Sequence, residues 1–542
     1  MTDAVSSSRD APRVTHTLAV PAVVTFTLLA IYIATLAPSV TYWDAGEFLS
    51  AIRTLGIPHP PGTPLYILIG NVWARVLGPV FGFAYSVNLL SAVSTAVACG
   101  MIAYLMNGWT QRPFAAAAGG ILAGLMSSVW LNANETEVYA PSLFVSMLLL
   151  LVAERARVTR ETRWYVLLAY LIGLGWSLQL SALVAAPAAL YLALFCREDT
   201  EVRGQLRVAR ASFSTVARMI IVIGLGATAV LFMLIRAKHD PGINQGNPAT
   251  WQAFLDVISR KQYLPVPMWP RQAPLYIQIG NLFEYADWQV ALGLSPEAPP
   301  SWLRTPFTIL YAALGVVGCI WHRHVHKVSW RTVMLLFITG TLGVIVYLNM
   351  KASPSYGEGF LPVGAKHEAR ERDYFFALAF LCWGLWAGAG AIRIAARFGS
   401  RARIAGFAVV LLPALLNWRA VDRGSWPQSD APRYNAMKEL TGAPQLAVVF
   451  ANGDNDTYPA WYLQQVEGVR RDVVVITIPL LGAGWYREEI ARRYRLVPDE
   501  YARVWRGQGA TLSVICRAAA TQGRVVVSSQ QRDGSALPAA CM

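Results

Sequence analysis

Charge is scarce in this chain. Asp, Glu, Lys and Arg make up 14% of its 542 residues, whereas 55% are hydrophobic, and 19 Trp and 22 Tyr are available for membrane interfaces. The formal charge of +14 would suggest a nucleic-acid partner in a soluble protein, but here the cations stand mostly in short segments between apolar runs. The composition therefore predicts an integral membrane protein that binds the lipid bilayer and no nucleic acid.

Cysteine is also scarce, and the chain lacks the common cofactor motifs. Four of the six cysteines lie in or beside apolar segments, which argues against a disulfide framework or a zinc site; they are Cys99, Cys196, Cys319 and Cys382. Cys516 and Cys541 could pair, although nothing in the sequence requires it. No phosphate-binding loop or dinucleotide fingerprint stands at a strand-to-helix turn. No internal repeat stands out, whereas an inverted repeat would have favoured a transporter.

Long apolar runs dominate residues 1–420. The first run, residues 17–36, is about as long as the ~20 residues that a bilayer requires, and we interpret it as an uncleaved anchor. The run 164–195 is too long for one crossing, so we expect it to cross twice, with a turn near residues 173–176. Further runs are 84–106, 114–131, 139–153, 219–235, 306–321, 333–348, 374–391 and 404–416. Together they predict about eleven transmembrane helices.

Orientation depends on the stretch 62–83. If this stretch lies in the outer interface, the arginine-rich connections 155–163, 197–218 and 393–403 all face the cytoplasm, as the distribution of positive charge favours. Counting the stretch as a span would place them outside. We therefore expect the N-terminus inside and the C-terminal part outside.

On this topology four polar segments meet at the outer face, together with the tail. They are the first outer loop (38–83) and the segments 132–138, 236–304 and 351–373. The tail contains short β-like runs at 446–450, 473–478 and 525–528 between helical stretches. The sequence thus predicts a transmembrane domain, 1–420, and a small extracytoplasmic α/β domain, 421–542.

The first outer loop carries an acidic pair, Asp44 and Glu47. A carboxylate near a low-dielectric surface has its pKa raised toward the operating range of a general base. The alternative is helix capping, with Asp44 at the N-cap and Glu47 as the third helical residue, and the two roles can coexist.

Other polar residues allow a functional and a structural interpretation. His59 stands among prolines that restrict its backbone, which suits a ligand contact, but by itself the position favours a loop histidine without a role. Glu135 and Glu137 precede a helix start, where acidic residues complement the helix dipole. Arg370 and Arg372 suit an anionic headgroup, or they pair with neighbouring carboxylates. The segment 452–459 is typical of a turn and lacks the spacing of a calcium site.

Five blocks of the chain carry a family resemblance. They are residues 43–48, 56–65, 135–140, 371–375 and 452–463, and they occur in the family's order. They resemble the bacterial branch of a multi-pass transmembrane O-mannosyltransferase family, whose animal relative acts on plexin-type receptor domains.

The resemblance implies a glycosyltransferase of the GT-C fold in the inner (cytoplasmic) membrane. Such an enzyme would transfer a sugar, here mannose, from a polyprenyl-phosphate donor to Ser or Thr hydroxyls of exported proteins, with inversion and without a redox or nucleotide cofactor. Asp44 would be the base and Glu47 would position the acceptor or the base. His59, Arg370 and Arg372 would bind the donor phosphate.

The remaining residues of these blocks would bind the acceptor or the sugar. They are Glu135, Glu137, Tyr139, Asn452, Asp454, Asn455 and Asp456. We expect no metal, because histidines do not cluster, although some enzymes of this fold use a divalent ion. The alternatives are transfer of another lipid-linked sugar to a lipid or glycan, a lipid-linked sugar transporter, and a receptor that uses the outer domain as a binding module.

Overall fold

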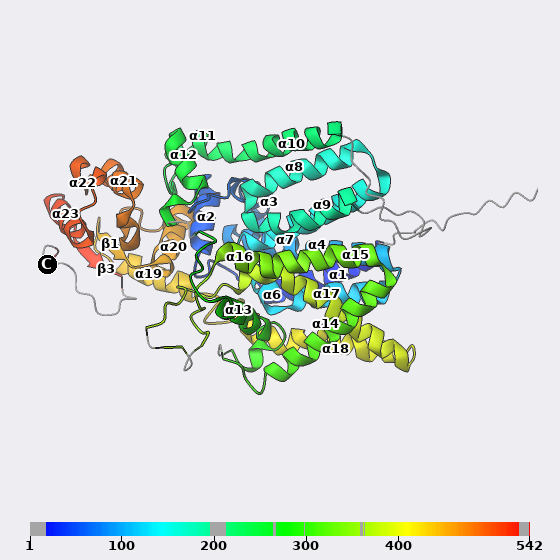
Figure 1. Cartoon of the computed structure of the whole chain (residues 1–542). Coiled ribbons are helices and arrows are strands. Elements are labelled where there is room, and N and C mark those ends of the chain that lie inside the picture. Colours follow the sequence, from blue (N-terminus) through cyan, green and yellow to red (C-terminus); the bar gives the residue numbers. More distant parts are fainter. Residues whose placement is uncertain are drawn as a thin grey trace, which may run out of the picture.

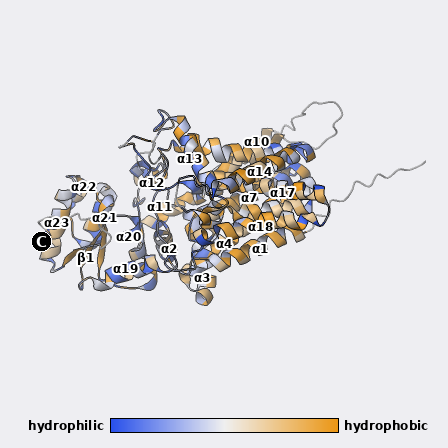
Figure 2. Ribbon diagram, turned by 90° about the horizontal axis from the view of Figure 1, so that it is seen from below, coloured by the Kyte–Doolittle hydropathy of each residue, from blue (hydrophilic) through white to orange (hydrophobic). Residues whose placement is uncertain are grey.

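The computed structural model describes residues 18–195, 213–263, 267–296, 299–357, 361–362, 364–529 and 541. Long helices form a bundle at one end of the molecule, and a small sheet with short helices forms the other end (Figure 1). Hydropathy follows the same division, because the bundle is largely hydrophobic and the sheet-containing end is more hydrophilic (Figure 2).

Small residues allow the helices of the bundle to pack closely. Its helices are α1 (Ala19–Thr35), α3 (Pro64–Phe81), α4 (Phe83–Thr110), α5 (Pro113–Leu125), α6 (Ser127–Ala133), α7 (Tyr139–Thr159), α8 (Thr162–Leu178), α9 (Ala186–Phe195), α10 (Phe213–Ala227), α14 (Thr305–Val325), α15 (Lys327–Ile338), α16 (Val344–Leu348), α17 (Ala377–Ala395) and α18 (Ala402–Val421). A Cβ added to Gly388 on α17 would lie 2.3 Å from the carbonyl oxygen of Ala118 on α5. Such close backbone approach is typical of helices that associate within a membrane.

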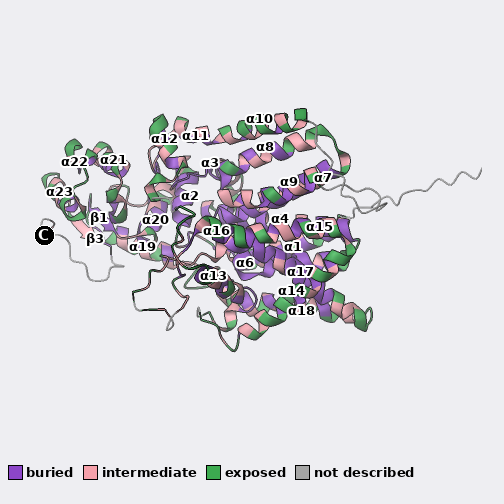
Figure 3. Cartoon of the chain, viewed as in Figure 1, coloured by how far each residue is buried: buried purple, intermediate pink, exposed green. Residues whose placement is uncertain are grey.

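The outer helices leave apolar side chains uncovered. Ile220 on α10, Ile309 on α14 and Leu415 on α18 are all exposed, and these helices carry exposed outer faces while α4, α7 and α17 are largely buried (Figure 3). Exposed apolar surface of this extent is unusual for a soluble protein, so lipid is its expected environment.

Seven helices among the described residues are long and apolar enough to cross a membrane, or eight if the bent pair α5–α6 counts as one span. This confirms the predicted class, a polytopic α-helical membrane protein, but not the predicted number of about eleven helices. Part of the difference is length, because α1 and α8 have 17 residues each and α9 has 10. α3 is long and apolar enough to cross a membrane, although we assigned the stretch 62–83 to the interface. The orientation therefore stays a prediction.

The prediction of a turn near residues 173–176 is wrong. α8 continues through these residues to Leu178, and the chain breaks at Gln179 before the 3-10 turn η1 (Leu180–Ala185). The glycines serve a helix contact instead, because a Cβ at Gly173 would lie 2.2 Å from the carbonyl oxygen of Ile223 on α10.

The sheet near the C-terminus has three parallel strands. β1 (Val448–Ala451) lies between β2 (Val474–Thr477) and β3 (Val526–Ser528), so each run predicted as β-like overlaps a strand. Parallel strands need crossover connections, which here contain helices. They are α20 (Asp454–Tyr462), α21 (Gly484–Tyr494), α22 (Asp499–Arg503) and α23 (Gln508–Thr521), and α19 (Ala431–Gly442) precedes the sheet. Cys516 forms a disulfide with Cys541. The boundary at residue 421 stays a prediction.

Short elements join the two ends of the molecule. α2 (Ala45–Thr54) lies between the bundle and α20 (Figure 1). A Cβ added to Gly46 on α2 would lie 2.3 Å from the carbonyl oxygen of Tyr458 on α20, so only glycine allows this approach. The segment 236–304 contributes α12 (Trp251–Ile258), η3 (Lys261–Tyr263) and α13 (Leu275–Asp287), and Ile57 pairs with Asn244 in a parallel bridge. Segments distant in the chain therefore meet at this junction.

Candidate active site

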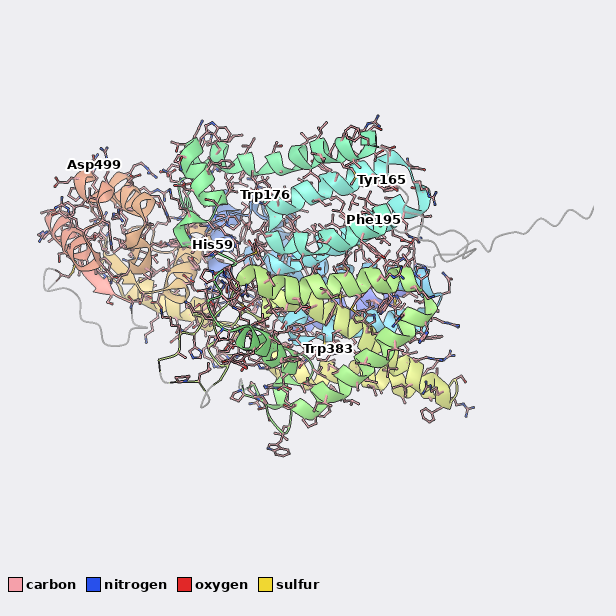
Figure 4. The ribbon with its side chains drawn as sticks, viewed as in Figure 1. His59, Tyr165, Trp176, Phe195, Trp383 and Asp499 are labelled. Carbon is pink, nitrogen blue, oxygen red and sulfur yellow. A yellow bond between two sulfur atoms is a disulfide. The ribbon has the colours of Figure 1, made fainter. Side chains whose placement is uncertain are left out.

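A cavity of about 1360 Å³ lies at the junction. The predicted site residues in its wall are Asp44, His59, Glu137, Tyr139, Arg370, Arg372 and Asp454. They come from α2, the loop after it, the start of α7, the loop before α17, and α20. Figure 4 shows His59 at the boundary between the helical bundle and the sheet-containing end. The cavity thus gathers most of the residues that the family resemblance singled out.

Asp44 pairs with Arg370. Asp44 holds the N-cap position of α2 without a capping hydrogen bond from its side chain, so its carboxylate is available to the cavity. Arg370 Nη2 donates to Asp44 Oδ2 at 2.8 Å, and the guanidinium lies over the rings of Trp43 and Tyr374 at 5.2 and 5.3 Å. Burial alone would raise the pKa of Asp44, but the charges of His59 and Arg370 outweigh burial and lower it. Asp44 is therefore an ionised carboxylate at neutral pH.

Glu47 faces His59 rather than the start of its own helix. His59 Nδ1 lies 2.5 Å from Glu47 Oε2, and the backbone N–H of His59 donates to Glu47 Oε1 at 2.7 Å. The side-chain amide of Gln245 also donates to Oε1. The predicted capping box is therefore absent among the described contacts of these two residues. Burial would lower the pKa of His59, but Glu47 raises it to about 9.

Glu137 is another carboxyl group of the cavity wall, and it interacts electrostatically with Asp44. Its side chain is buried, and burial together with the charge of Asp44 raises its pKa well above the ordinary value. Oε2 accepts a hydrogen bond from the backbone N–H of Val138 at 3.2 Å. The raised pKa favours the neutral form of Glu137, which can both donate and accept hydrogen bonds in the cavity.

In the loop before α17, the two arginines line the cavity, whereas two acidic residues are hydrogen-bonded to side chains outside its wall. Arg372 lines the cavity, where Nη1 donates to the hydroxyl of Tyr374 at 2.9 Å and Glu368 lies 3.7 Å away. Glu371 instead accepts from the hydroxyl of Tyr285 at 3.1 Å, and Asp373 accepts from the hydroxyl of Ser128 at 2.6 Å. Arg370 and Arg372 are therefore only partly neutralised by nearby carboxylates of their own loop.

Besides Glu47, four predicted site residues lie outside the cavity wall: Glu135, Asn452, Asn455 and Asp456. Glu135 is 3.5 Å from Arg423. Asn455 accepts from the backbone N–H of Trp43 at 2.7 Å, and Asp456 accepts from the backbone N–H of Asn452 and the hydroxyl of Ser529. These contacts build the turn beside α20 and attach it to the Asp44 loop. A direct role in binding acceptor or sugar stays a prediction for these four residues.

The sequence left the segment 236–304 without a function, yet it forms part of the wall. Gln245, Arg260 and Tyr263 line the cavity, as does Lys351 from the next outer segment. The Nε of Arg260 is buried and has no hydrogen-bond partner among the described residues. The only hint in the sequence is the polar turn 244–247 and the basic pair at 260–261, which are common in loops of any function.

No group of three or more His, Cys, Asp or Glu in the described part of the chain could hold a metal ion. The cavity instead combines carboxyl groups with arginines, histidine and aromatic rings. Such a set can bind a phosphate by charge-assisted hydrogen bonds, stack against a sugar, and accept a proton from a hydroxyl group.

Two family models match parts of the chain. Residues 44–202 match the protein O-mannosyl-transferase TMEM260 N-terminal domain, and residues 433–497 match the TMEM260-associated domain 2. The site residues Asp44 and Glu137 lie in the first match, and Asp454 lies in the second. The family resemblance stated from the sequence blocks is confirmed.

Curated relatives carry the same family name. The chain is 34% identical over 139 residues to protein O-mannosyl-transferase TMEM260 of Mus musculus, covering 24% of this chain and 19% of that protein. It is 24% identical over 251 residues to the Dictyostelium discoideum protein of that name, covering 43% of this chain and 29% of that protein. The matches therefore span less than a third of these relatives.

Solved structures resemble the whole chain more loosely. ArnT from Cupriavidus metallidurans bound to undecaprenyl phosphate is 10% identical, with a TM-score of 0.48 over 84% of this chain and 89% of that one. The archaeal oligosaccharyltransferase AglB from Archaeoglobus fulgidus, in complex with an inhibitory peptide and a dolichol-phosphate, is 11% identical, with a TM-score of 0.49 over 95% of this chain and 69% of that one.

Proposed function

We propose that this chain, which carries two domains of the protein O-mannosyl-transferase TMEM260 family, is a membrane glycosyltransferase of the GT-C fold. It would transfer mannose from a polyprenyl-phosphate donor to Ser or Thr hydroxyls of exported proteins. The observation that carries the proposal is the ionised Asp44 beside Arg370, in a cavity at the polar end of the apolar bundle.

The wall residues supply the parts of a direct displacement. Asp44 takes the proton of the acceptor hydroxyl while the hydroxyl oxygen forms a bond to the anomeric carbon of the sugar. The bond from that carbon to the donor phosphate oxygen breaks, and the lipid phosphate leaves as an anion with the electron pair. One displacement inverts the anomeric centre.

Cations stabilise the leaving group in this mechanism. His59, Arg370 and Arg372 stand in the wall with Asp44, and arginine pairs well with phosphate oxygens. A lipid phosphate is already stable as an anion, so the reaction needs cations more than it needs a general acid. The neutral carboxyl of Glu137 suits hydrogen bonds to sugar hydroxyls.

We also propose that the cavity faces the extracytoplasmic side of the inner membrane. The disulfide between Cys516 and Cys541 supports this orientation, because disulfides persist in oxidising compartments and are rare in the cytosol. The lipid donor would then reach the cavity from the bundle, and an exported protein would reach it from the polar side.

The test is transfer by the purified protein from polyprenyl phosphate mannose to a Ser/Thr-containing acceptor protein. Asp44→Asn should lower the rate about a hundredfold or more, because the general base is lost. Asp472→Asn is the matched control, since Asp472 pairs with Arg470 in the sheet-containing end. Transfer at the wild-type rate by Asp44→Asn would remove Asp44 from the role of base. Absence of transfer by the wild type would argue against mannose as the sugar.

A further inference from the structure

Glu47 cannot reach a substrate in this structure. Its side chain has no exposed surface, and its two carboxylate oxygens are occupied by the His59 ring, the His59 backbone N–H and the amide of Gln245. Glu47 lies on α2, whereas His59 belongs to the proline-rich loop and Gln245 to the segment 236–304. Three separate parts of the chain therefore converge on one carboxylate.

His59, in contrast, is partly open to the cavity. Nδ1 is held by Glu47, and 23% of the side chain is exposed. The ring also packs against Phe48, with ring centroids 5.6 Å apart. Among the described residues, none forms a hydrogen bond with Nε2. This nitrogen can therefore donate to a ligand when the ring is protonated.

We infer that Glu47 and Gln245 are positioning residues that hold His59 as a cation, with Nε2 available to bind the phosphate of the lipid-linked donor. The inference rests on the proposed function for the identity of the ligand. It assigns Glu47 a role different from the one the family resemblance implied, which was to position the acceptor or the base.

The charges around His59 favour its protonated form. Glu47 and Asp44 on α2 and Asp454 on α20 attract the proton, whereas Arg370 opposes it. Burial lowers the pKa of His59, but the carboxylates, Glu47 above all, outweigh it and raise the pKa to about 9. Without Glu47 the pKa should fall to the ordinary value of about 6.5 or below, because burial disfavours the charged ring.

The first experiment measures the titration of the His59 ring without substrate. The full chain is labelled with ¹³C at histidine Cε1, and His59→Gln assigns the signal by its loss. We expect a midpoint near 9 in the wild type and at or below about 6.5 in Glu47→Gln. Glu467→Gln is the matched control, because Glu467 pairs with Arg433 away from the cavity and should leave the midpoint unchanged. A wild-type midpoint below about 7 would overturn the inference.

The second experiment measures transfer from polyprenyl phosphate mannose between pH 5.5 and 9.5. At pH 8, Glu47→Gln should be about thirtyfold slower than the wild type, because a ring with a pKa of 6.5 is only about 3% protonated there. The rate should recover toward the wild-type value near pH 5.5. Gln245→Ala should shift the profile in the same direction by less.

A purely structural role of Glu47 predicts a different result. If Glu47→Gln lowers the rate by the same factor at every pH, the inference is wrong. In the double variant Glu47→Gln/His59→Lys, a permanent cation should remove the pH dependence above 6.5. If the titration midpoints agree with expectation but the wild type transfers no sugar, the positioning of His59 stands and the proposed reaction is contradicted instead.

Discussion

At the residue scale, Arg370 has two proposed roles: it pairs with the base Asp44, and it stabilises the departing phosphate. It donates a hydrogen bond of 2.8 Å to Asp44, and its guanidinium lies over the rings of Trp43 and Tyr374. A cation in this place keeps the base ionised, but it also makes the carboxylate a weaker proton acceptor. The arrangement suits a reaction in which the same guanidinium then meets the departing phosphate.

The pH profile should reveal this coupling. Arg370→Gln removes the cation that lowers the pKa of Asp44, so this pKa should rise and the acidic limb of the pH–rate profile should move to higher pH. At neutral pH we expect at least about a tenfold loss of rate, because phosphate stabilisation is lost as well. Transfer rates from pH 4 to 9 check the prediction, with Arg470→Gln in the sheet-containing end as the control. An acidic limb that stays in place would show that Arg370 does not tune Asp44.

Glu137 should tolerate loss of its ionisable group. Because burial and Asp44 keep it protonated, Glu137→Gln preserves both the charge and the shape of the side chain. We expect a rate within about threefold of the wild type, since the amide retains one donor and one acceptor. Glu137→Ala should cost more, because it removes both. Rates of sugar transfer at pH 7 distinguish the two variants, and a collapse in Glu137→Gln would mean that the ionised form of Glu137 acts.

At the scale of elements, the contact between α2 and α20 sets the position of the site. Gly46 lies between Asp44 and Glu47 in the sequence and touches the backbone of Tyr458 on α20. Asn455 on the same helix receives the backbone N–H of Trp43. The sheet-containing end is therefore attached to the Asp44 loop by a close backbone approach and by a hydrogen bond to a side-chain amide.

Gly46→Ala should disturb both folding and activity. Its Cβ would lie 2.3 Å from the carbonyl oxygen of Tyr458, so α2 and α20 must separate. Overpacking of this kind costs about 1–3 kcal/mol, and displacement of Asp44 should lower the rate further. Gly78→Ala on α3 is the matched control, because its Cβ would meet atoms no closer than 3.8 Å. Thermal unfolding in detergent and transfer rates test both variants; equal behaviour of the two would contradict a close contact.

At the scale of the whole molecule, the chain separates an apolar bundle from a more polar end (Figure 2). The cavity is lined by residues from both parts. This division is what a lipid-linked donor and a polar acceptor require, because each must approach one point from a different solvent. The proposed orientation follows from the disulfide and from the distribution of arginines.

Cysteine labelling tests the orientation. Thr521→Cys lies at the exposed C-terminal end of α23 in the sheet-containing end, and Ser400→Cys lies in the exposed connection between α17 and α18. In intact cells a membrane-impermeant maleimide should label the first variant and not the second, while both should react after permeabilisation. The wild-type chain is the control for labelling of native cysteines. Labelling of Ser400→Cys alone would invert the proposed topology.

The sequence by itself determined the class, the strands and the candidate base. Long apolar runs indicate membrane helices directly, because every backbone polar group in lipid must be hydrogen-bonded within a helix or a closed sheet. The short apolar runs of the tail indicated β1, β2 and β3, because strands also have a local sequence pattern. Asp44 was identified by its place in the first outer loop and in a family block, and Arg370 by the cations of the outer segment 351–373, rather than by periodicity.

Only the tertiary structure decided which groups meet. The Glu47–His59–Gln245 contact joins residues that no local pattern relates. Where we expected a turn, α8 continues through Gly173, which packs closely against α10. A local stretch of sequence indicates secondary-structure propensity and hydropathy over a few helical turns. Which side chains meet across long sequence separations depends on how the whole chain packs. For the same reason the sequence named Asp44 as a candidate base, while its pKa and its partner emerged only in the cavity.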